Sequence, residues 1–235
     1  MDETTAPLLL MTRPEPASAR FLSDLAARLG RPVPALVSPV LRIVPVGSAP
    51  RAAMDEEIVV TSANAAPALT KLSGRTAHCV GARSAEAARN AGLSVATVAR
   101  DVAGLIERLA GDGAPLLYLR GKHVTRSLTV PGRLVRDVVV YDQLAVSLND
   151  EAAARLTVAT PLICPLFSVR SSRLLATETD GSVAPLVVVA LSDAVAAAWE
   201  RPVHGVAATP DGQGMLSAVA DTLESYGVGS TRPTV

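Results

Sequence analysis

Short runs of hydrophobic residues alternate with segments of helical periodicity along most of the chain. The run 8–11 is entirely apolar, and the helix predicted after it carries Phe21, Leu22, Leu25 and Leu29 on one face before Gly30. Fully apolar runs are typical of parallel strands that are covered on both faces. The alternation predicts an α/β fold with parallel sheets. Strands are expected at 8–11, 33–37, 58–60, 78–80, 94–98, 115–119, 162–167, 186–191 and 203–207.

Two extended apolar segments have no helix of their own. They cover residues 40–46 and 136–146. We expect them to run side by side and to join two lobes. The predicted organisation is a terminal lobe of residues 1–38 and 147–235, an inserted lobe of residues 47–136, and connecting segments 39–46 and 137–146.

The turns that connect strands to the helices after them form the candidate ligand-binding edge of each sheet. Ser62 (or Asn64) and Ser84 are expected to cap the helices that follow two consecutive strands. The free N–H groups and the dipole of a helix start favour anions, and ligands of α/β sheets bind beyond the carboxyl ends of the strands. The residues expected at those ends are Thr12, Thr61, Ser62, Gly81, Ser84, Arg120, Ser168, Ser192 and Thr209.

Composition narrows the class of protein. The 235 residues suffice for one large or two small domains, and 49% of them are hydrophobic, enough for a full core. The 22 basic residues balance the 22 acidic ones, so no global charge favours nucleic acid or a membrane. Cys79 and Cys164 are expected to be buried free thiols. The acidic start and the short apolar runs argue against a signal peptide and a membrane span, so we expect a cytoplasmic protein.

Several catalytic and cofactor motifs are missing from the sequence. No G-x-G-x-x-G follows a predicted strand, and neither a Walker loop nor a G-x-S-x-G elbow occurs. His78 and His204 lie on predicted strands and are interpreted as structural. His123, in a loop near Arg120 and Lys122, is less clearly so. An enzyme with this sequence is expected to use no metal and no cofactor.

The chain resembles the uroporphyrinogen-III synthases over nearly its whole length. The resemblance rests on the order and spacing of LMTRP (10–14), VTSANA (60–65), VGARSA (80–85), AGL (91–93), LRG (119–121), VVY (139–141) and TPDG (209–212). It implies two flavodoxin-like or Rossmann-like lobes joined by a two-stranded antiparallel ladder. The implied reaction closes linear hydroxymethylbilane to uroporphyrinogen III, with ring D inverted and water lost, through azafulvene and spiro intermediates in a cleft between the lobes.

The resemblance also implies roles for individual residues. Tyr141 is the expected catalytic residue, because a phenol can donate a proton to the departing hydroxyl at neutral pH. A half-buried strand tyrosine is the alternative interpretation, and Tyr118 and Tyr226 are interpreted in that way. The expected substrate-binding residues are Arg13, Thr61, Ser62, Ala63, Arg83, Ser84, Arg120, Ser168, Val169 and Ser192. Further candidate cations are Lys122, Arg126 and Arg170, each of which can equally be a solvated surface charge.

The partners expected from this interpretation are a small-molecule substrate, no nucleic acid and no membrane, and the protein is expected to be a monomer. A two-lobe cytoplasmic binding or regulatory module without catalysis is the main alternative. The joint 190–195 lacks the glycine and threonine usual in the family, which favours that module, whereas Tyr141, Ser62 and Ser84 favour the enzyme. A doubly wound nucleotide enzyme is weakened by the missing glycine fingerprint.

Overall fold

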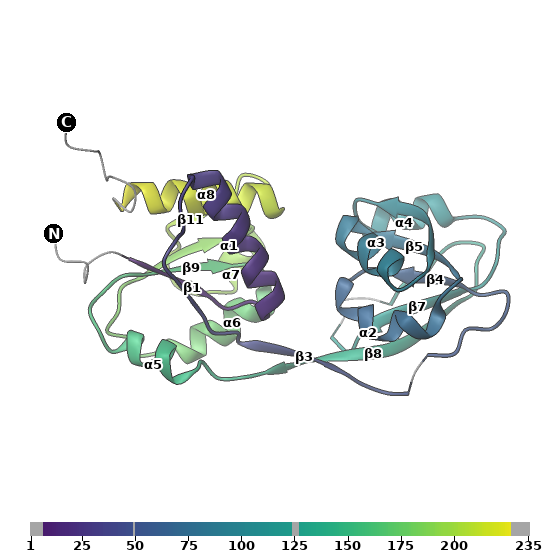
Figure 1. Ribbon diagram of the computed structural model, residues 1–235, viewed down its shortest axis with the longest axis horizontal. Coiled ribbons are helices and arrows are strands. Elements are labelled where there is room, and N and C mark those ends of the chain that lie inside the picture. The colour runs from purple at the N-terminus through teal and green to yellow at the C-terminus, as the bar shows by residue number, and fades with distance from the viewer. Residues whose placement is uncertain (1–6, 49, 124–126, 227–235) are drawn as a thin grey trace. The chain divides into compact units, whose positions relative to one another are not determined.

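The computed structural model describes residues 7–48, 50–123 and 127–226. The chain divides into two compact units (Figure 1), of which the first comprises Met1–Arg42 with Ala145–Val235 and the second comprises Ile43–Leu144. Both are built from strands and helices in alternation around parallel sheets, which confirms the predicted α/β class.

The sheet of the first unit has the strand order β11-β10-β9-β1-β2. All of its pairings are parallel. Counted in chain order within the unit, the arrangement is the flavodoxin-like 2-1-3-4-5. The strands are β1 (Leu8–Met11), β2 (Ala35–Val37), β9 (Leu162–Leu166), β10 (Leu186–Ala190) and β11 (Gly205–Val206).

Helices cover both faces of this sheet, as the fully apolar strands require. Leu9 and Met11 pack with α1 (Glu15–Leu29) and α8 (Gly212–Ser225). Leu10 lies in the opposite cluster, which also draws on α5 (Asp150–Leu156), α6 (Val169–Glu178) and α7 (Asp193–Ala197). Successive residues of a strand therefore point to opposite faces of the sheet and pack in two separate cores.

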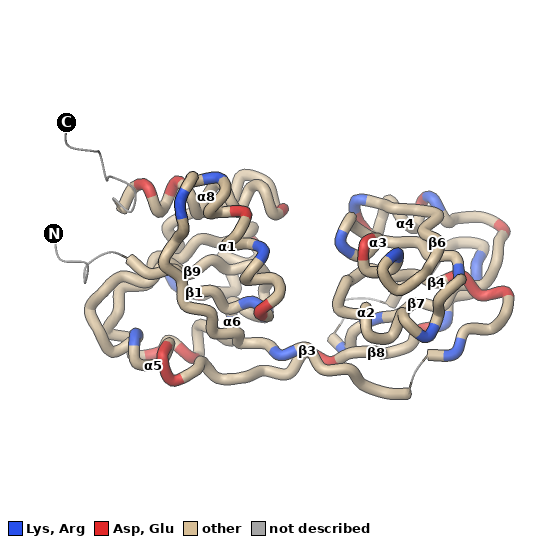
Figure 2. The backbone as a smooth tube through the Cα atoms, in the orientation of Figure 1, with Lys and Arg blue, Asp and Glu red and all other residues tan. Residues whose placement is uncertain are grey.

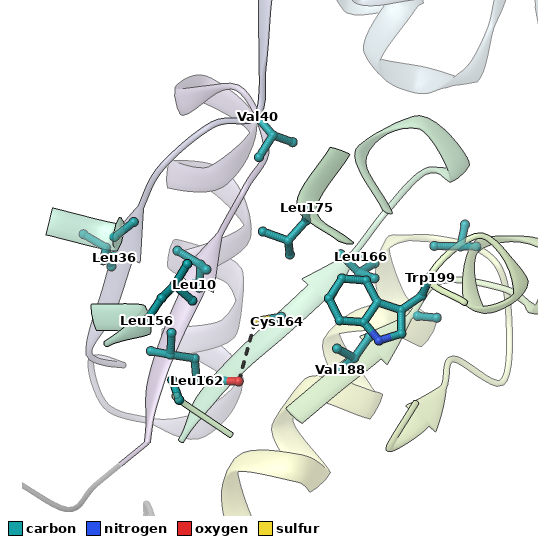
Figure 3. Packing of buried hydrophobic residues seen from close by; sticks show 14 of the residues in the cluster. Leu10, Leu36, Val40, Leu156, Leu162, Cys164, Leu166, Leu175, Val188 and Trp199 are labelled. Carbon is teal, nitrogen blue, oxygen red and sulfur yellow. Dashed lines mark hydrogen bonds between the residues drawn. The ribbon is translucent and has the colours of Figure 1, made fainter. Parts of the chain in front are cut away.

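Figure 3 shows the second of these clusters, in which Leu10, Leu166, Leu175 and Val188 surround Cys164 and Trp199. The Cys164 thiol lies 3.6 Å from the carbonyl oxygen of Leu162, and burial raises its pKa to about 12. Burial likewise raises the pKa of Cys79, in the second unit, to about 11. Both cysteines are buried and free, as predicted from the sequence.

The sheet of the second unit has the order β3-β8-β7-β4-β5-β6. Its five strands from β4 onwards pair in parallel, and counted in chain order they give the Rossmann-like arrangement 3-2-1-4-5. The strands are β3 (Leu41–Pro45), β4 (Glu57–Val60), β5 (Thr76–Val80), β6 (Ser94–Ala99), β7 (Leu116–Gly121) and β8 (Val135–Ala145).

Helical segments again pack on both faces of this second sheet. One core contains residues of η2 (Ala63–Ala65), α2 (Ala66–Leu69), η3 (Thr70–Leu72) and α3 (Gly81–Asn90). The other contains residues of α4 (Val102–Leu109). The helix expected after the Ser62 cap forms three short pieces over residues 63–72. Pro67, within α2, has no backbone N–H to donate and cannot continue a regular hydrogen-bond ladder.

Strands β3 and β8 contain the two points where the chain passes from one unit to the other. The N–H of Val46 donates to Val140 and the N–H of Val146 donates to Val40, so the two segments run antiparallel. The first part of β8 also pairs in parallel with β7, a pairing that the sequence did not predict.

Figure 2 shows basic and acidic positions interspersed within each unit, in line with the balanced composition. In the part of the chain that the structure describes, no helix has the length and apolar character needed to cross a membrane.

Candidate functional site

Each sheet has one point at which the strand order reverses direction. In the first unit it lies between β1 and β9, and in the second unit between β4 and β7. Ligands of open α/β sheets bind beyond the carboxyl ends of the strands at such a point. Thr61 and Ser62 follow β4, and Arg120 and Gly121 end β7, so these residues flank the switch point of the second unit.

Two hydroxyl groups meet at this switch point. Thr61 Oγ1 lies 3.0 Å from the hydroxyl of Tyr118, whose side chain is buried. The sequence had assigned Tyr118 a structural role only, because its register opposite Val59 is invisible without the strand pairing. Ser62 Oγ accepts a hydrogen bond of 3.2 Å from the N–H of Asn64 and so caps η2, as predicted.

The next joint differs from the prediction for Ser84. Helix α3 begins at Gly81, so Ser84 lies inside the helix, is buried, and does not cap it. Gly81 has a φ of +77°, which an L side chain rarely adopts, and this conformation takes the chain from β5 directly into the helix. Arg83, in the first turn, is exposed to solvent.

Tyr141 lies in β8 and is 8% exposed. Its ring packs in the core that contains η2 and α3 residues. Pairing between β7 and β8 is irregular here: Arg120 lies opposite Val139, whereas Gly121 lies opposite Tyr141. Backbone pairing then continues, because the N–H of Lys122 donates to the carbonyl of Tyr141 over 2.9 Å.

The cations at the end of β7 are held by carboxylates. Arg120 donates to Asp137 over 2.9 Å, and Lys122 and His123 each lie 3.1 Å from Asp142. Burial opposes ionisation of Asp142. Hydrogen bonds from Lys122 and from the Gln143 N–H outweigh it, so the pKa of the carboxyl lies below its ordinary value. Arg126, another predicted cation, lies outside the described residues.

The first unit presents its own predicted residues at equivalent positions. The guanidinium of Arg13, after β1, stacks over the ring of Phe167, after β9, at 4.1 Å from its centroid. Ser168 accepts a hydrogen bond of 3.1 Å from the Ser171 N–H and caps α6, and the exposed Val169 opens that helix. Ser192 precedes α7 without making a capping hydrogen bond.

The predicted residues thus fall into two groups, one at the carboxyl edge of each sheet. The second unit brings together the larger group, which comprises Thr61, Ser62, Ala63, Arg83, Ser84, Arg120 and Tyr141. The contacts that Tyr118, Gly121 and Asp142 make at this edge were not predicted from the sequence. The position of Asp142 directly after Tyr141 was the one available signal for the last of these.

The remaining histidines lie away from these edges. His78 Nε2 lies 3.0 Å from Glu57, which also accepts from Arg133, near the amino edge of the second sheet. His204 Nδ1 accepts from the N–H of Val188. These contacts within the chain support the structural roles predicted for both residues.

A hollow of about 360 Å³ in the first unit also lies apart from the candidate edges, and Trp199, Arg201 and His204 line it. Arg201 stacks on Trp199 and donates to Ala176 and Thr179 at the end of α6. Since its polar groups serve the fold, this hollow is not the candidate site.

Comparison with known proteins agrees with the fold. The family model described as uroporphyrinogen-III synthase HemD matches residues 22–220. The chain belongs to the uroporphyrinogen-III synthase family. Membership indicates the function of that family, which is a cyclising lyase acting on a small molecule.

One solved structure of the family shares the fold, and a second matches less well. The uroporphyrinogen-III synthetase of Helicobacter pylori 26695 is 14% identical, with a TM-score of 0.63, over 93% of this chain and 100% of that chain. The Thermus thermophilus uroporphyrinogen III synthase is 17% identical with a TM-score of 0.38, over 93% and 100% of the two chains. A search of curated proteins found no match.

The low pKa of Asp142 predicts a defined pH dependence. A depressed carboxyl pKa contributes stability above the ordinary value of about 3.9, and that stability is lost as the pH falls through the folded-state pKa. Asp142→Asn should therefore lower the thermal midpoint at neutral pH, because Lys122 and His123 lose their carboxylate. The difference from wild type should shrink below about pH 4.

Thermal unfolding followed by circular dichroism at several pH values measures this effect. Asp55→Asn, at an exposed position of the same unit, is the matched control and should change little at any pH. A difference between Asp142→Asn and wild type that is constant with pH would contradict the assignment.

Proposed function

We propose that the protein converts linear hydroxymethylbilane into uroporphyrinogen III, with inversion of ring D and loss of water, and that it uses no cofactor. One observation carries the proposal beyond family membership. The Tyr141 phenol lies at the carboxyl edge of the second unit's sheet, on β8, and only β7 separates this strand from the switch point. Backbone donors, hydroxyls and anchored cations surround this edge.

The substrate implied by the family carries many carboxylates, and the edge offers groups suited to them. The first backbone N–H groups of η2 and α3 have no helical acceptor of their own, and a helix start attracts negative charge. Lys122, whose side chain is 64% exposed, retains donors that can reach a ligand. Binding would thus combine neutral donors with a few local cations.

Tyr141 is proposed as the proton donor. As the carbon–oxygen bond of the ring A hydroxymethyl group breaks, the phenol gives its proton to the departing hydroxyl, which leaves as water. The pyrrole nitrogen supplies the electron pair that forms the cationic azafulvene. The substituted α-carbon of ring D then attacks the azafulvene to form the spiro intermediate. The bond from that carbon to the ring C methylene breaks, and the other α-carbon of ring D bonds this methylene to reclose the macrocycle. That α-carbon loses its proton, which returns to the Tyr141 phenolate. General acid catalysis of this kind contributes about 10²–10⁴-fold.

Control of conformation is the larger task in this proposal. The bilane can also close without inversion, so the protein must hold ring D with its substituted carbon facing the azafulvene. Positioning of reacting groups can contribute about 7–11 kcal/mol of a reaction barrier. A cytoplasmic location and a monomeric state remain predictions that accompany the proposal.

Product isomer analysis tests the proposed reaction. Hydroxymethylbilane is generated in situ, the protein is added, and the oxidised uroporphyrins are separated. A type III excess that grows with protein concentration is expected. Type I alone, formed by a folded sample, would mean that the chain shares the fold of the family without its reaction, and the binding-module interpretation would replace the enzyme.

Substitution of the phenol tests the role of Tyr141. Tyr141→Phe should lower the rate of type III formation by more than about tenfold, because the proton donor is removed while the ring remains. The thermal midpoint should change little. Tyr226→Phe, at an exposed position at the end of α8, is the control and should keep the wild-type rate. Near-normal turnover of Tyr141→Phe would exclude the acid role.

A further inference from the structure

The position of Gly121 beside Tyr141 has a physical consequence for the proposed reaction. A Cβ atom built on Gly121 would lie 2.6 Å from Cε2, 2.7 Å from Cζ and 3.0 Å from the hydroxyl oxygen of Tyr141. Real Cβ atoms essentially never approach other atoms closer than 3.0 Å. The Tyr141 ring therefore occupies the space that any side chain at position 121 would need.

Backbone conformation does not explain the glycine. Gly121 does not have the positive φ seen at Gly81, Gly92 and Gly132. An alanine could adopt the backbone of Gly121 without strain, so the requirement for glycine is one of space alone. Substitution at this position consequently tests the contact with the ring and little else.

The strand irregularity explains how the two residues come together. Pairing shifts between Arg120 and Gly121, so that Tyr141 lies opposite Gly121 where regular pairing would place Val140. Bulges of this kind turn a side chain away from its regular direction and are frequent beside active sites. After the shift, the N–H of Lys122 donates a hydrogen bond to the carbonyl of Tyr141. The side chains of Lys122 and His123 contact the carboxylate of Asp142.

We propose that Gly121 is a positioning residue. Because glycine has no side chain, the Tyr141 ring can occupy the space beside it, and this determines the position of the phenol at the carboxyl edge of the sheet. Gly121 contributes no group to the reaction and acts through Tyr141. The inference deepens the proposed function and rests on it for its catalytic consequence. The packing relation between the two residues rests on geometry alone.

Gly121→Ala should displace the ring and lower kcat by at least about tenfold, since a displacement near 1 Å can cost about a hundredfold. KM should stay within about twofold of wild type, because the binding donors are elsewhere on the edge. Gly104→Ala, in α4 of the same unit, is the matched control. Its added Cβ would meet only Asp101 Oδ1 at 3.4 Å, so kcat should be unchanged.

A double variant separates positioning from general damage. If Gly121 acts through the phenol, adding Gly121→Ala to Tyr141→Phe should lower kcat by no more than about a further twofold. The reason is that the effects of two substitutions on one catalytic group are not additive. A full loss in both backgrounds overturns the proposal, as does wild-type kcat in Gly121→Ala. Should Gly121→Ala fail to fold, Tyr141→Leu added to it should restore folding, and continued unfolding overturns the proposal.

Fluorine NMR gives a readout that is independent of activity. With meta-fluorotyrosine at the three tyrosines, Gly121→Ala should move the Tyr141 resonance more than those of Tyr118 and Tyr226. An unmoved Tyr141 resonance overturns the positioning role, whatever reaction the protein catalyses. A moved resonance in a protein that forms only the type I isomer would retain the packing relation and reject the proposed function.

Discussion

The parallel pairing of β8 with β7 is the interaction on which the candidate site depends. This pairing adds β8 to the second sheet next to β7, which borders the switch point. It also brings Tyr141 to the carboxyl edge of the sheet, where Thr61, Ser62 and Arg120 lie. The same strand continues into antiparallel pairing beside β3. One segment thus completes a sheet, carries the chain between units, and supplies the phenol.

The electrostatics of this edge follow from pairing rather than from net charge. Arg120 and Lys122 each meet a carboxylate, and Asp142 is the more deeply buried member of its pair with Lys122. A carboxylate that pairs with a cation fixes its position and reduces the local field that it produces. Recognition of an acidic substrate would then depend on geometry and on backbone donors, and association should respond only weakly to salt.

Much of this was accessible from the sequence because local patterns report local structure. Apolar runs predicted the parallel strands, and the hydroxyl of Ser62 predicted the cap of η2, whereas the cap that Ser168 forms on α6 was not predicted. The cap expected at Ser84 was wrong, because the positive φ of Gly81 starts the helix earlier. The contacts of Tyr118 and Gly121 were not predicted because they depend on strand register, which relates residues far apart in the chain. The family resemblance supplied Tyr141, which no spacing rule singles out.

The central claim is that an acidic tetrapyrrole meets the carboxyl edge of the second sheet. Amide NMR of the labelled protein, titrated with uroporphyrinogen III under reducing conditions, tests it most directly. The account predicts that the largest shift changes fall on the amides of Ser62, Ala63, Arg83 and Lys122, while those of Glu57 and His78 at the amino edge stay in place. Changes concentrated at the amino edge, or none at saturating ligand, would contradict it.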